Sequence, residues 1–169
     1  MKIINIFGAP SAGKSTTAAG VYAALKKRRE HAEIVLEYAK ELAWNNKLDG
    51  CPLTSLMILG EQAKRLKVYL GTDVKFVVTD SPLVMSSIYN RDAEPLVLAA
   101  HKSFDSINIL LDRKNRPYDN AGRVQTHSES LALDNEILAL LKRNSIKYHV
   151  VNSEDVDSIL KLLDEYENN

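Results

Sequence analysis

Short apolar runs alternate with longer amphipathic stretches along the whole chain. The apolar runs are rich in Val and Ile and too short for helices, so we predict that they form strands. They lie at residues 2–7, 33–37, 74–80, 107–112 and 146–151. The stretches between them have apolar positions at helical spacing and predict helices near residues 14–29, 38–47, 53–70, 82–103, 128–143 and 153–166. Three of these helices have a candidate N-cap, namely Thr54, Ser128 and Ser153.

This alternation of strands and helices predicts the fold class. Strands that are apolar throughout are buried on both faces, and helices are the usual crossover between parallel strands. We therefore predict an α/β fold with three layers, in which helices cover both faces of a five-stranded parallel sheet. A chain of 169 residues with 45% hydrophobic content suits one domain spanning residues 1–169.

Composition narrows the class of protein. Lys plus Arg equals Asp plus Glu at 22 each, so no overall field attracts nucleic acid or an anionic membrane, and any contact with nucleic acid is expected to be local. Cys51 is the only cysteine, which excludes an intramolecular disulfide and fits a reducing compartment. No apolar run approaches the roughly 20 residues of a membrane span. We expect a cytoplasmic protein without a membrane partner.

The segment "GAPSAGKS" carries the most specific chemistry in the chain. It matches the phosphate-binding pattern G-x-x-x-x-G-K-[ST] in full, and it lies between the first predicted strand and the first predicted helix. Backbone N–H groups of such a loop, together with the helix N-terminus, bind phosphate oxygens. Lys14 is expected to reach the β- and γ-phosphates of ATP, and Ser15 to bind Mg²⁺. The predicted nucleotide-binding residues of this loop are Gly8, Ala9, Pro10, Ser11, Ala12, Gly13, Lys14, Ser15 and Thr16.

Acidic residues follow two of the other predicted strands. Asp80 ends the strand in "VVTDSPL", and Glu37 follows the strand in "IVLEYAK". The carboxyl ends of parallel strands meet at one edge of a sheet, where this fold binds its ligands. Asp80 is a candidate for Mg²⁺ binding or for the base that accepts the proton of an acceptor hydroxyl, and Glu37 is a second candidate base. Two structural alternatives stay open: Asp80 as the cap of a helix begun by Pro82, and Glu37 as a partner of a helix dipole.

Basic residues gather between the fourth predicted strand and the helix near 128–143. Arg113, Lys114, Arg116 and Arg123 lie in a segment broken up by Pro, Asn and Gly. We predict a basic lid loop over about residues 113–127 that closes over the nucleotide. Arg113 is expected to bind the nucleotide, while Arg116 and Arg123 act on the charge that develops during transfer. The alternative is a solvated turn.

With these motifs in hand, the chain resembles the P-loop nucleoside and nucleotide kinases of the thymidylate-kinase-like group. The resemblance covers nearly the whole chain and rests on the phosphate loop together with "EYAKEL", "TDSPL" and "RPYDNAGRVQT". It is closest in kind to small phage-type ATP-binding proteins and to ribosylnicotinamide kinase domains. The "DSP" segment stands where thymidylate kinases have a "DRY"-type motif, which argues against phosphorylation of dTMP.

The resemblance implies cofactors and residue roles. ATP and Mg²⁺ are the implied cofactors, Lys14 and Ser15 hold phosphate and metal, and Glu37 or Asp80 serves the acceptor side. Gln62 is the nearest match to the glutamine that deoxynucleoside kinases offer to a base.

We therefore expect an ATP-dependent phosphotransferase that moves the γ-phosphate to a hydroxyl of a nucleobase-containing acceptor. The most specific candidate that the resemblance implies is 5-hydroxymethyl-deoxyuridine in phage DNA, in thymidine hypermodification, which places the protein in the host cytoplasm. The "KKRR" run at residues 26–29 is either a local DNA-binding patch or the solvated end of a helix. The alternatives are a kinase of a small nucleoside, a nucleotide or ribosylnicotinamide, and a P-loop NTPase switch. Whether the protein is a homodimer is open.

Overall fold

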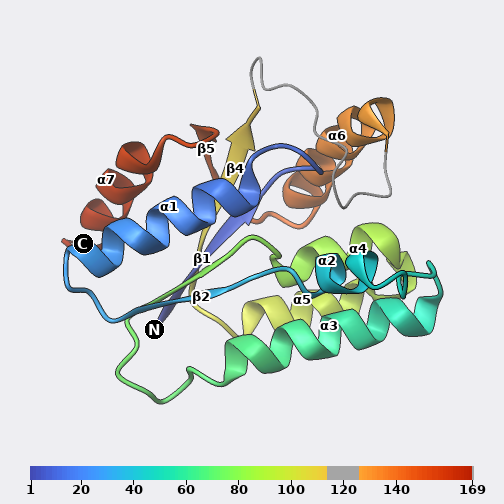
Figure 1. Ribbon diagram of the computed structural model, residues 1–169, viewed down its shortest axis with the longest axis horizontal. Coiled ribbons are helices and arrows are strands. Elements are labelled where there is room, and N and C mark those ends of the chain that lie inside the picture. The colour runs from blue at the N-terminus through green and yellow to red at the C-terminus, as the bar shows by residue number, and fades with distance from the viewer. Residues whose placement is uncertain (114–125, 169) are drawn as a thin grey trace.

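A parallel β-sheet forms the centre of the computed structural model, which describes residues 1–113 and 126–168. The described residues contain five strands in the order β2–β3–β1–β4–β5, and all neighbouring strands are parallel (Figure 1). The strands are β1 (Lys2–Phe7), β2 (Ala32–Val35), β3 (Phe76–Thr79), β4 (Ser106–Asp112) and β5 (His149–Asn152). The predicted α/β class and the five-stranded parallel sheet are confirmed.

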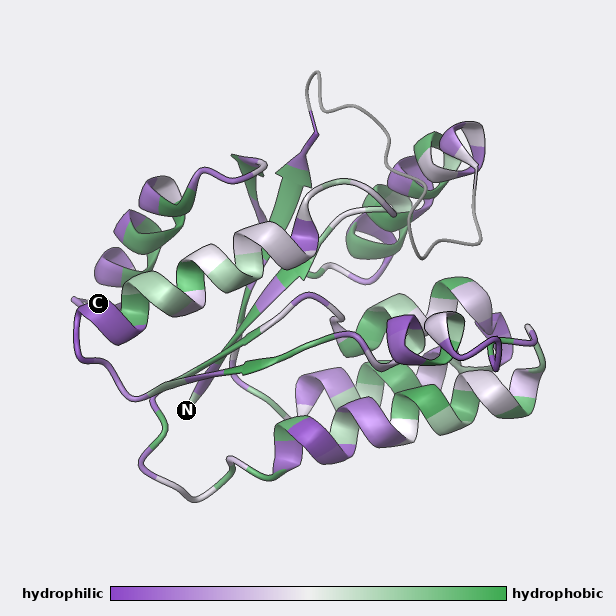
Figure 2. Ribbon diagram, in the orientation of Figure 1, coloured by the Kyte–Doolittle hydropathy of each residue, from purple (hydrophilic) through white to green (hydrophobic). Residues whose placement is uncertain are grey.

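Helices cover both faces of this sheet. One apolar core joins the sheet to α1 (Lys14–Lys27) and α7 (Val156–Glu167). A second core joins the other face to α3 (Pro52–Lys67), α5 (Glu94–Lys102) and α6 (His127–Arg143). Figure 2 shows a largely hydrophobic β4 and helices that carry both hydrophobic and hydrophilic residues. The predicted three layers are therefore present. No helix within the described ranges is long and apolar enough to cross a bilayer.

The segment predicted as one helix over residues 82–103 is broken into shorter pieces. These are the 3₁₀ turn η1 (Leu83–Met85), α4 (Ser86–Tyr89), the 3₁₀ turn η2 (Arg91–Ala93) and α5. Asn90 separates α4 from η2 with an extended backbone, φ −145° and ψ 91°. Pro95 lies in the first turn of α5, where its missing N–H is tolerated, but it prevents a continuous helix through the preceding turn. The apolar pattern continued across this break and concealed it.

The three predicted N-caps are also wrong. The helices begin after Cys51, Thr126 and Asp155. Thr126 and Glu129 form a reciprocal capping box, in which Glu129 Oε2 accepts from the Thr126 N–H at 2.6 Å. The T-x-x-E pattern and the proline after Cys51 were the available signals for these helix starts.

The strand order positions the site. β3 pairs with both β2 and β1, and Thr79 lies in register with Val35 on one side and Asn5 on the other. The carboxyl ends of β2, β3 and β1 therefore lie side by side. The segments that follow them, including the short helix α2 (Tyr38–Trp44) after β2, meet at one edge of the sheet.

Candidate active site

The phosphate loop runs from the end of β1 into α1 and turns tightly on itself. Gly8 has φ 154°, and a Cβ atom at this position would lie 2.8 Å from the Cβ atom of Ala12. Gly13, the residue before α1, adopts a left-handed φ of 90°. Side chains at either position would clash with or strain the loop, so both glycines are needed for its shape. The loop thus leaves a cradle at the N-terminus of α1, the feature that binds phosphate groups.

Helix α6 holds the first half of this loop. Asp134 Oδ1 accepts a hydrogen bond from the Ala9 N–H at 3.0 Å, and Ser130 Oγ donates to the Pro10 carbonyl at 2.6 Å. Arg113, just after β4, reaches the same two side chains at 2.7 Å from Asp134 Oδ2 and 2.8 Å from Ser130 Oγ. We call these three residues the Arg113–Ser130–Asp134 cluster. The sequence signal for this cluster is weak, namely the spacing of four that places Ser130 and Asp134 on one face of the helix.

The predicted lid is only partly described. The Arg113 side chain is 15% exposed and lies beside the phosphate loop. Its Nε atom is buried without a hydrogen-bond partner among the described residues. Its nucleotide-binding role stays a prediction. Arg116, Arg123 and most of the segment predicted as the lid lie outside the described residues.

Ser15 and Asp80 bring a hydroxyl and a carboxylate together at the other side of the loop. Ser15 Oγ donates to Asp80 Oδ2 at 2.5 Å, and Asp80 is only 2% exposed. Asp80 Oδ1 is buried and has no hydrogen-bond partner in the described part of the chain. A buried carboxylate oxygen without a partner is costly unless a ligand satisfies it. Hydroxyl and carboxylate oxygens are the ligands Mg²⁺ prefers, so these residues fit the implied metal.

The alternative role of Asp80 as a helix cap is not what the structure shows. The turn after β3 is η1, and the residue before it is Pro82. None of the described side chains caps this turn. The carboxylate of Asp80 is directed to Ser15 instead.

A cavity of about 370 Å³ opens next to the phosphate loop. Lys14, Glu37 and Asp80 all line it, so the structure brings together the three side chains that the strand ends were expected to place side by side. The remaining wall comes from α2, the segment after it, α3 and α4. The volume lies within the range of small-molecule sites, which is about 300–1,000 Å³.

Glu37 is the residue before α2, but its side chain does not cap that helix by a hydrogen bond within the described structure. Tyr89, at the end of α4, lines the same cavity and is 55% exposed as a whole residue, although protein atoms surround its phenol end. Loss of solvent around the phenol, with the negative charges of Glu37 and Glu136, raises the pKa of Tyr89 to about 12. A tyrosine is protonated at neutral pH even at its usual pKa of about 10, and this shift extends the protonated range to higher pH.

Gln62 does not have the role that the resemblance implied. The residue is 2% exposed. Its amide bonds to the Tyr38 N–H, the Leu36 carbonyl and the Thr79 hydroxyl. A side-chain amide already occupied by these protein groups is not available to read a base.

Comparison with known families identifies the domain. A family model described as an AAA domain matches residues 3–158. The chain belongs to this AAA-domain family. Among curated proteins, none matches the sequence.

Several solved structures resemble this AAA-domain protein in fold, and two of those described here are named as kinases. NadR protein in complex with NR has a TM-score of 0.74 and 14% identity, over 95% of this chain and 51% of that one. This chain thus spans about half the length of NadR. Deoxyadenosine kinase from M. mycoides, with products dCMP and dCDP bound, has a TM-score of 0.58 and 18% identity over 98% of both chains. APS kinase CysC from Mycobacterium tuberculosis, in complex with AMPPNP and APS, has a TM-score of 0.51 and 13% identity, over 96% of this chain and 97% of that one. The AAA-domain protein therefore shares the fold of these structures.

Proposed function

We propose that this protein transfers the γ-phosphate of ATP to a hydroxyl group of a small nucleobase-containing acceptor bound in the 370 Å³ cavity. The observation that carries the proposal is the convergence of Lys14, Asp80 and Glu37 on that one cavity, directly beside the phosphate loop. A phosphate-binding lysine, an oxygen ligand for Mg²⁺ and a carboxylate base are the parts that phosphoryl transfer requires.

Different residues of the site have different roles in the proposed transfer. The loop amides and Lys14 would hold the phosphates of ATP, and Ser15 with Asp80 would hold Mg²⁺, which would supply positive charge to offset that of the phosphates. Because Asp80 is already bonded to Ser15, we assign the base role to Glu37. Glu37 takes the proton of the acceptor hydroxyl, whose oxygen forms a bond to the γ-phosphorus. The bond from that phosphorus to the bridging β–γ oxygen breaks, and ADP leaves.

The far wall of the cavity supports an acceptor with a flat ring. It is mostly apolar, with Tyr89 as an aromatic surface and Lys40 as a charged group. The apolar side chains of this wall are Ala39, Ala43, Leu48, Ile58 and Met85. Aromatic and aliphatic walls with a few polar groups suit a nucleobase or a pyridine ring. A nucleoside and ribosylnicotinamide are both acceptors of this kind, and the NR complex of NadR agrees with that choice.

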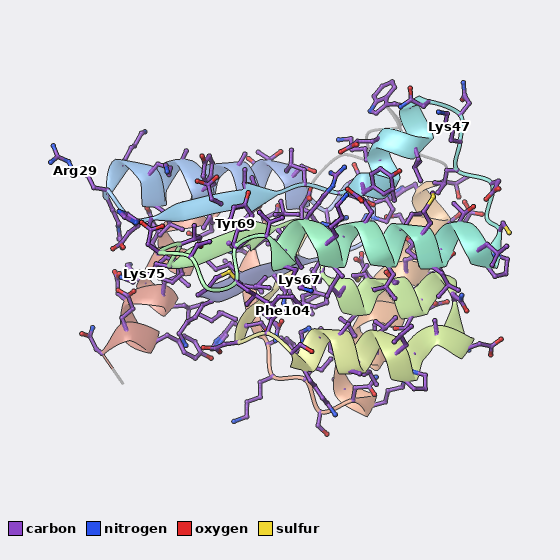
Figure 3. All side chains as sticks on the ribbon, turned by 90° about the horizontal axis from the view of Figure 1, so that it is seen from below. Arg29, Lys47, Lys67, Tyr69, Lys75 and Phe104 are labelled. Carbon is purple, nitrogen blue, oxygen red and sulfur yellow. The ribbon has the colours of Figure 1, made fainter. Side chains whose placement is uncertain are left out.

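A base within DNA is the second candidate, and the basic run at residues 26–29 gives it little support. This run ends α1 at the edge of the sheet opposite the phosphate loop. Arg29 is the last residue of this run, and Lys47 directly precedes the cavity residue Leu48. The two lie at opposite ends of the molecule in Figure 3. Arg28 pairs with Asp164 at 2.7 Å, and Lys26 pairs with Glu33 at 3.9 Å. These surface ion pairs support the interpretation of the run as the solvated end of a helix, and we place a small acceptor ahead of 5-hydroxymethyl-deoxyuridine in DNA.

The test is transfer of labelled γ-phosphate from ATP, with Mg²⁺, to a panel of acceptors. The panel holds nucleosides, nucleotides, ribosylnicotinamide, normal DNA and DNA containing 5-hydroxymethyluracil. Label on a small molecule supports the proposal, and label only on the hydroxymethylated DNA supports the second candidate. Label released solely as inorganic phosphate supports the NTPase switch. Lys14→Ala is the negative control, and an unchanged rate in that variant contradicts every kinase mechanism at this site.

A further inference from the structure

Gln62 is a buried amide in the middle of α3 whose hydrogen bonds all lead to the strand ends. The side chain is 2% exposed. Its oxygen and nitrogen reach three segments outside α3, namely the end of β2, the start of α2 and the end of β3. Burying an amide is costly unless its polar atoms are bonded, so the position favours a side chain with this pattern of donor and acceptor.

Two of these hydrogen bonds are made with the backbone on either side of Glu37. Gln62 Oε1 accepts from the Tyr38 N–H at 3.2 Å, and Gln62 Nε2 donates to the Leu36 carbonyl at 3.3 Å. The register of β2 with β3 ends at Val35, so the sheet ladder does not extend to these peptide groups. Gln62 therefore supplies hydrogen bonds to the backbone just beyond the end of the β2–β3 ladder.

The third bond reaches the residue before Asp80. Gln62 Nε2 donates to Thr79 Oγ1 at 3.4 Å, and the same oxygen accepts from the Ser81 N–H at 3.1 Å. Thr79 is fully buried. One amide group therefore connects the backbone around Glu37 to the hydroxyl that organises the backbone around Asp80.

We infer that Gln62 is a positioning residue, which fixes Glu37 at a constant place relative to Asp80 so that base and metal ligand face one acceptor. The inference rests on the proposed function for its catalytic consequence and on the hydrogen bonds for its structural one. Hydrogen bonds are directional, so they restrict the position and orientation of a backbone segment more than apolar packing does.

The first experiment is a double-mutant cycle on kcat between Gln62→Met and Glu37→Gln. The Met side chain has a similar length but no amide group. It cannot donate to the Leu36 carbonyl or the Thr79 hydroxyl, and it removes the amide oxygen that accepts from the Tyr38 N–H. We expect Gln62→Met to lower kcat about tenfold, in line with the sensitivity of catalysis to small misplacements, with the KM for ATP unchanged. In the Glu37→Gln background the same change should add almost nothing, because the group it positions is already inactive. Equal effects in both backgrounds, or an unchanged kcat, overturn the inference.

Asn108→Leu is the matched control. Asn108 is also a buried amide, bonded to Asn5 and to the Lys147 carbonyl, but it lies on β4, on the other side of β1. It should lower stability without lowering kcat. A loss of kcat as large as that of Gln62→Met would show a general effect of buried polar groups and overturn the positioning role.

The second experiment needs no activity. Hydrogen exchange of the Tyr38 amide proton, followed by NMR, should speed up at least tenfold in Gln62→Met and stay unchanged in Asn108→Leu. An unchanged exchange rate of the Tyr38 amide in Gln62→Met overturns the inference, whether or not the wild type is active. A wild type that phosphorylates no acceptor contradicts only the proposed function. If Gln62→Met does not fold, Thr79→Val removes the shared hydroxyl alone. The kcat of this variant should then fall, and its Ser81 amide proton should exchange faster. If either quantity stays at the wild-type value, the link from Gln62 to Asp80 is overturned.

Discussion

Ser15 Oγ and Asp80 Oδ2 are joined by a hydrogen bond of 2.5 Å, although 65 positions separate the two residues in the chain. The bond connects the first turn of α1 to the end of β3. It holds a hydroxyl and a carboxylate oxygen together, next to the second carboxylate oxygen of Asp80, which has no hydrogen-bond partner within the described structure. The fold alone thus assembles the oxygen atoms that we propose as ligands of Mg²⁺.

Replacing Asp80 tests this proposal directly. Asp80→Asn keeps the shape of the side chain but removes its charge, so kcat should fall by about a hundredfold, the size expected for losing one well-placed electrostatic group. The Mg²⁺ concentration needed for half-maximal rate should rise. Asp105→Asn is the control, since Asp105 is an exposed carboxylate paired with Lys2 at 2.9 Å. An Asp80→Asn enzyme with the Mg²⁺ dependence of the wild type would rule out Asp80 as a metal ligand.

The Arg113–Ser130–Asp134 cluster should stabilise the fold as a unit. Asp134→Ala leaves the Ala9 N–H and the Arg113 guanidinium without their carboxylate, so we expect the free energy of unfolding to fall by about 1–3 kcal/mol. Arg113→Ala should cost a similar amount, and the double variant less than the sum. Urea unfolding of the single and double variants measures this. Strictly additive losses would mean that the ion pair contributes nothing.

Tyr89 should act through its ring and not through its hydroxyl. The raised pKa of about 12 means that the folded protein holds the phenol proton more tightly than the unfolded chain does. Its contribution to stability is complete at neutral pH and is lost only as pH rises above about 10. Tyr89→Phe should therefore leave the pH profile of kcat unchanged from about pH 6 to 9, whereas Tyr89→Ala should raise the KM for the acceptor. A shifted profile in Tyr89→Phe would mean that the hydroxyl takes part in proton transfer.

Two glycines inside helices should respond in opposite directions to alanine. A Cβ atom on Gly20 in α1 would lie 2.7 Å from Val156 Cγ2 at the start of α7, whereas a Cβ atom on Gly60 in α3 would meet nothing within 4 Å. Gly60→Ala should raise the free energy of unfolding by about 0.5–1 kcal/mol through helix propensity. Gly20→Ala should lower it by about 1 kcal/mol because the clash outweighs that gain. Urea unfolding compares the two, and a stabilised Gly20→Ala would show that α7 moves aside freely.

Sequence reasoning was most successful where one local pattern decides the outcome. The Val- and Ile-rich runs predicted every strand of the described sheet within a few residues, and the acidic residues after two of them do reach the same cavity as Lys14. The break near Asn90 was missed because apolar spacing continues across it, even though Pro95 marks the start of a new helix.

The remaining parts of the site depend on contacts between distant segments. Gln62 was matched to a base-binding residue on sequence grounds, yet its amide is occupied by backbone that only the folded chain brings near it. Asp134 meets the Ala9 N–H across 125 positions. Side chains on an amphipathic helix do not reveal which of their polar members face inward toward a loop, so such roles emerge only from the three-dimensional arrangement.

The order of the strands also bears on how the specificity of this protein can change. The phosphate loop follows β1, which is flanked by strands on both sides, whereas Glu37 and α2 follow β2, a four-residue strand at the border of the sheet. Substitutions in residues 36–51 therefore leave the ladder of β1 intact. A library confined to that segment, with Glu37 kept, is the place to look for variants that phosphorylate a different alcohol while still consuming ATP.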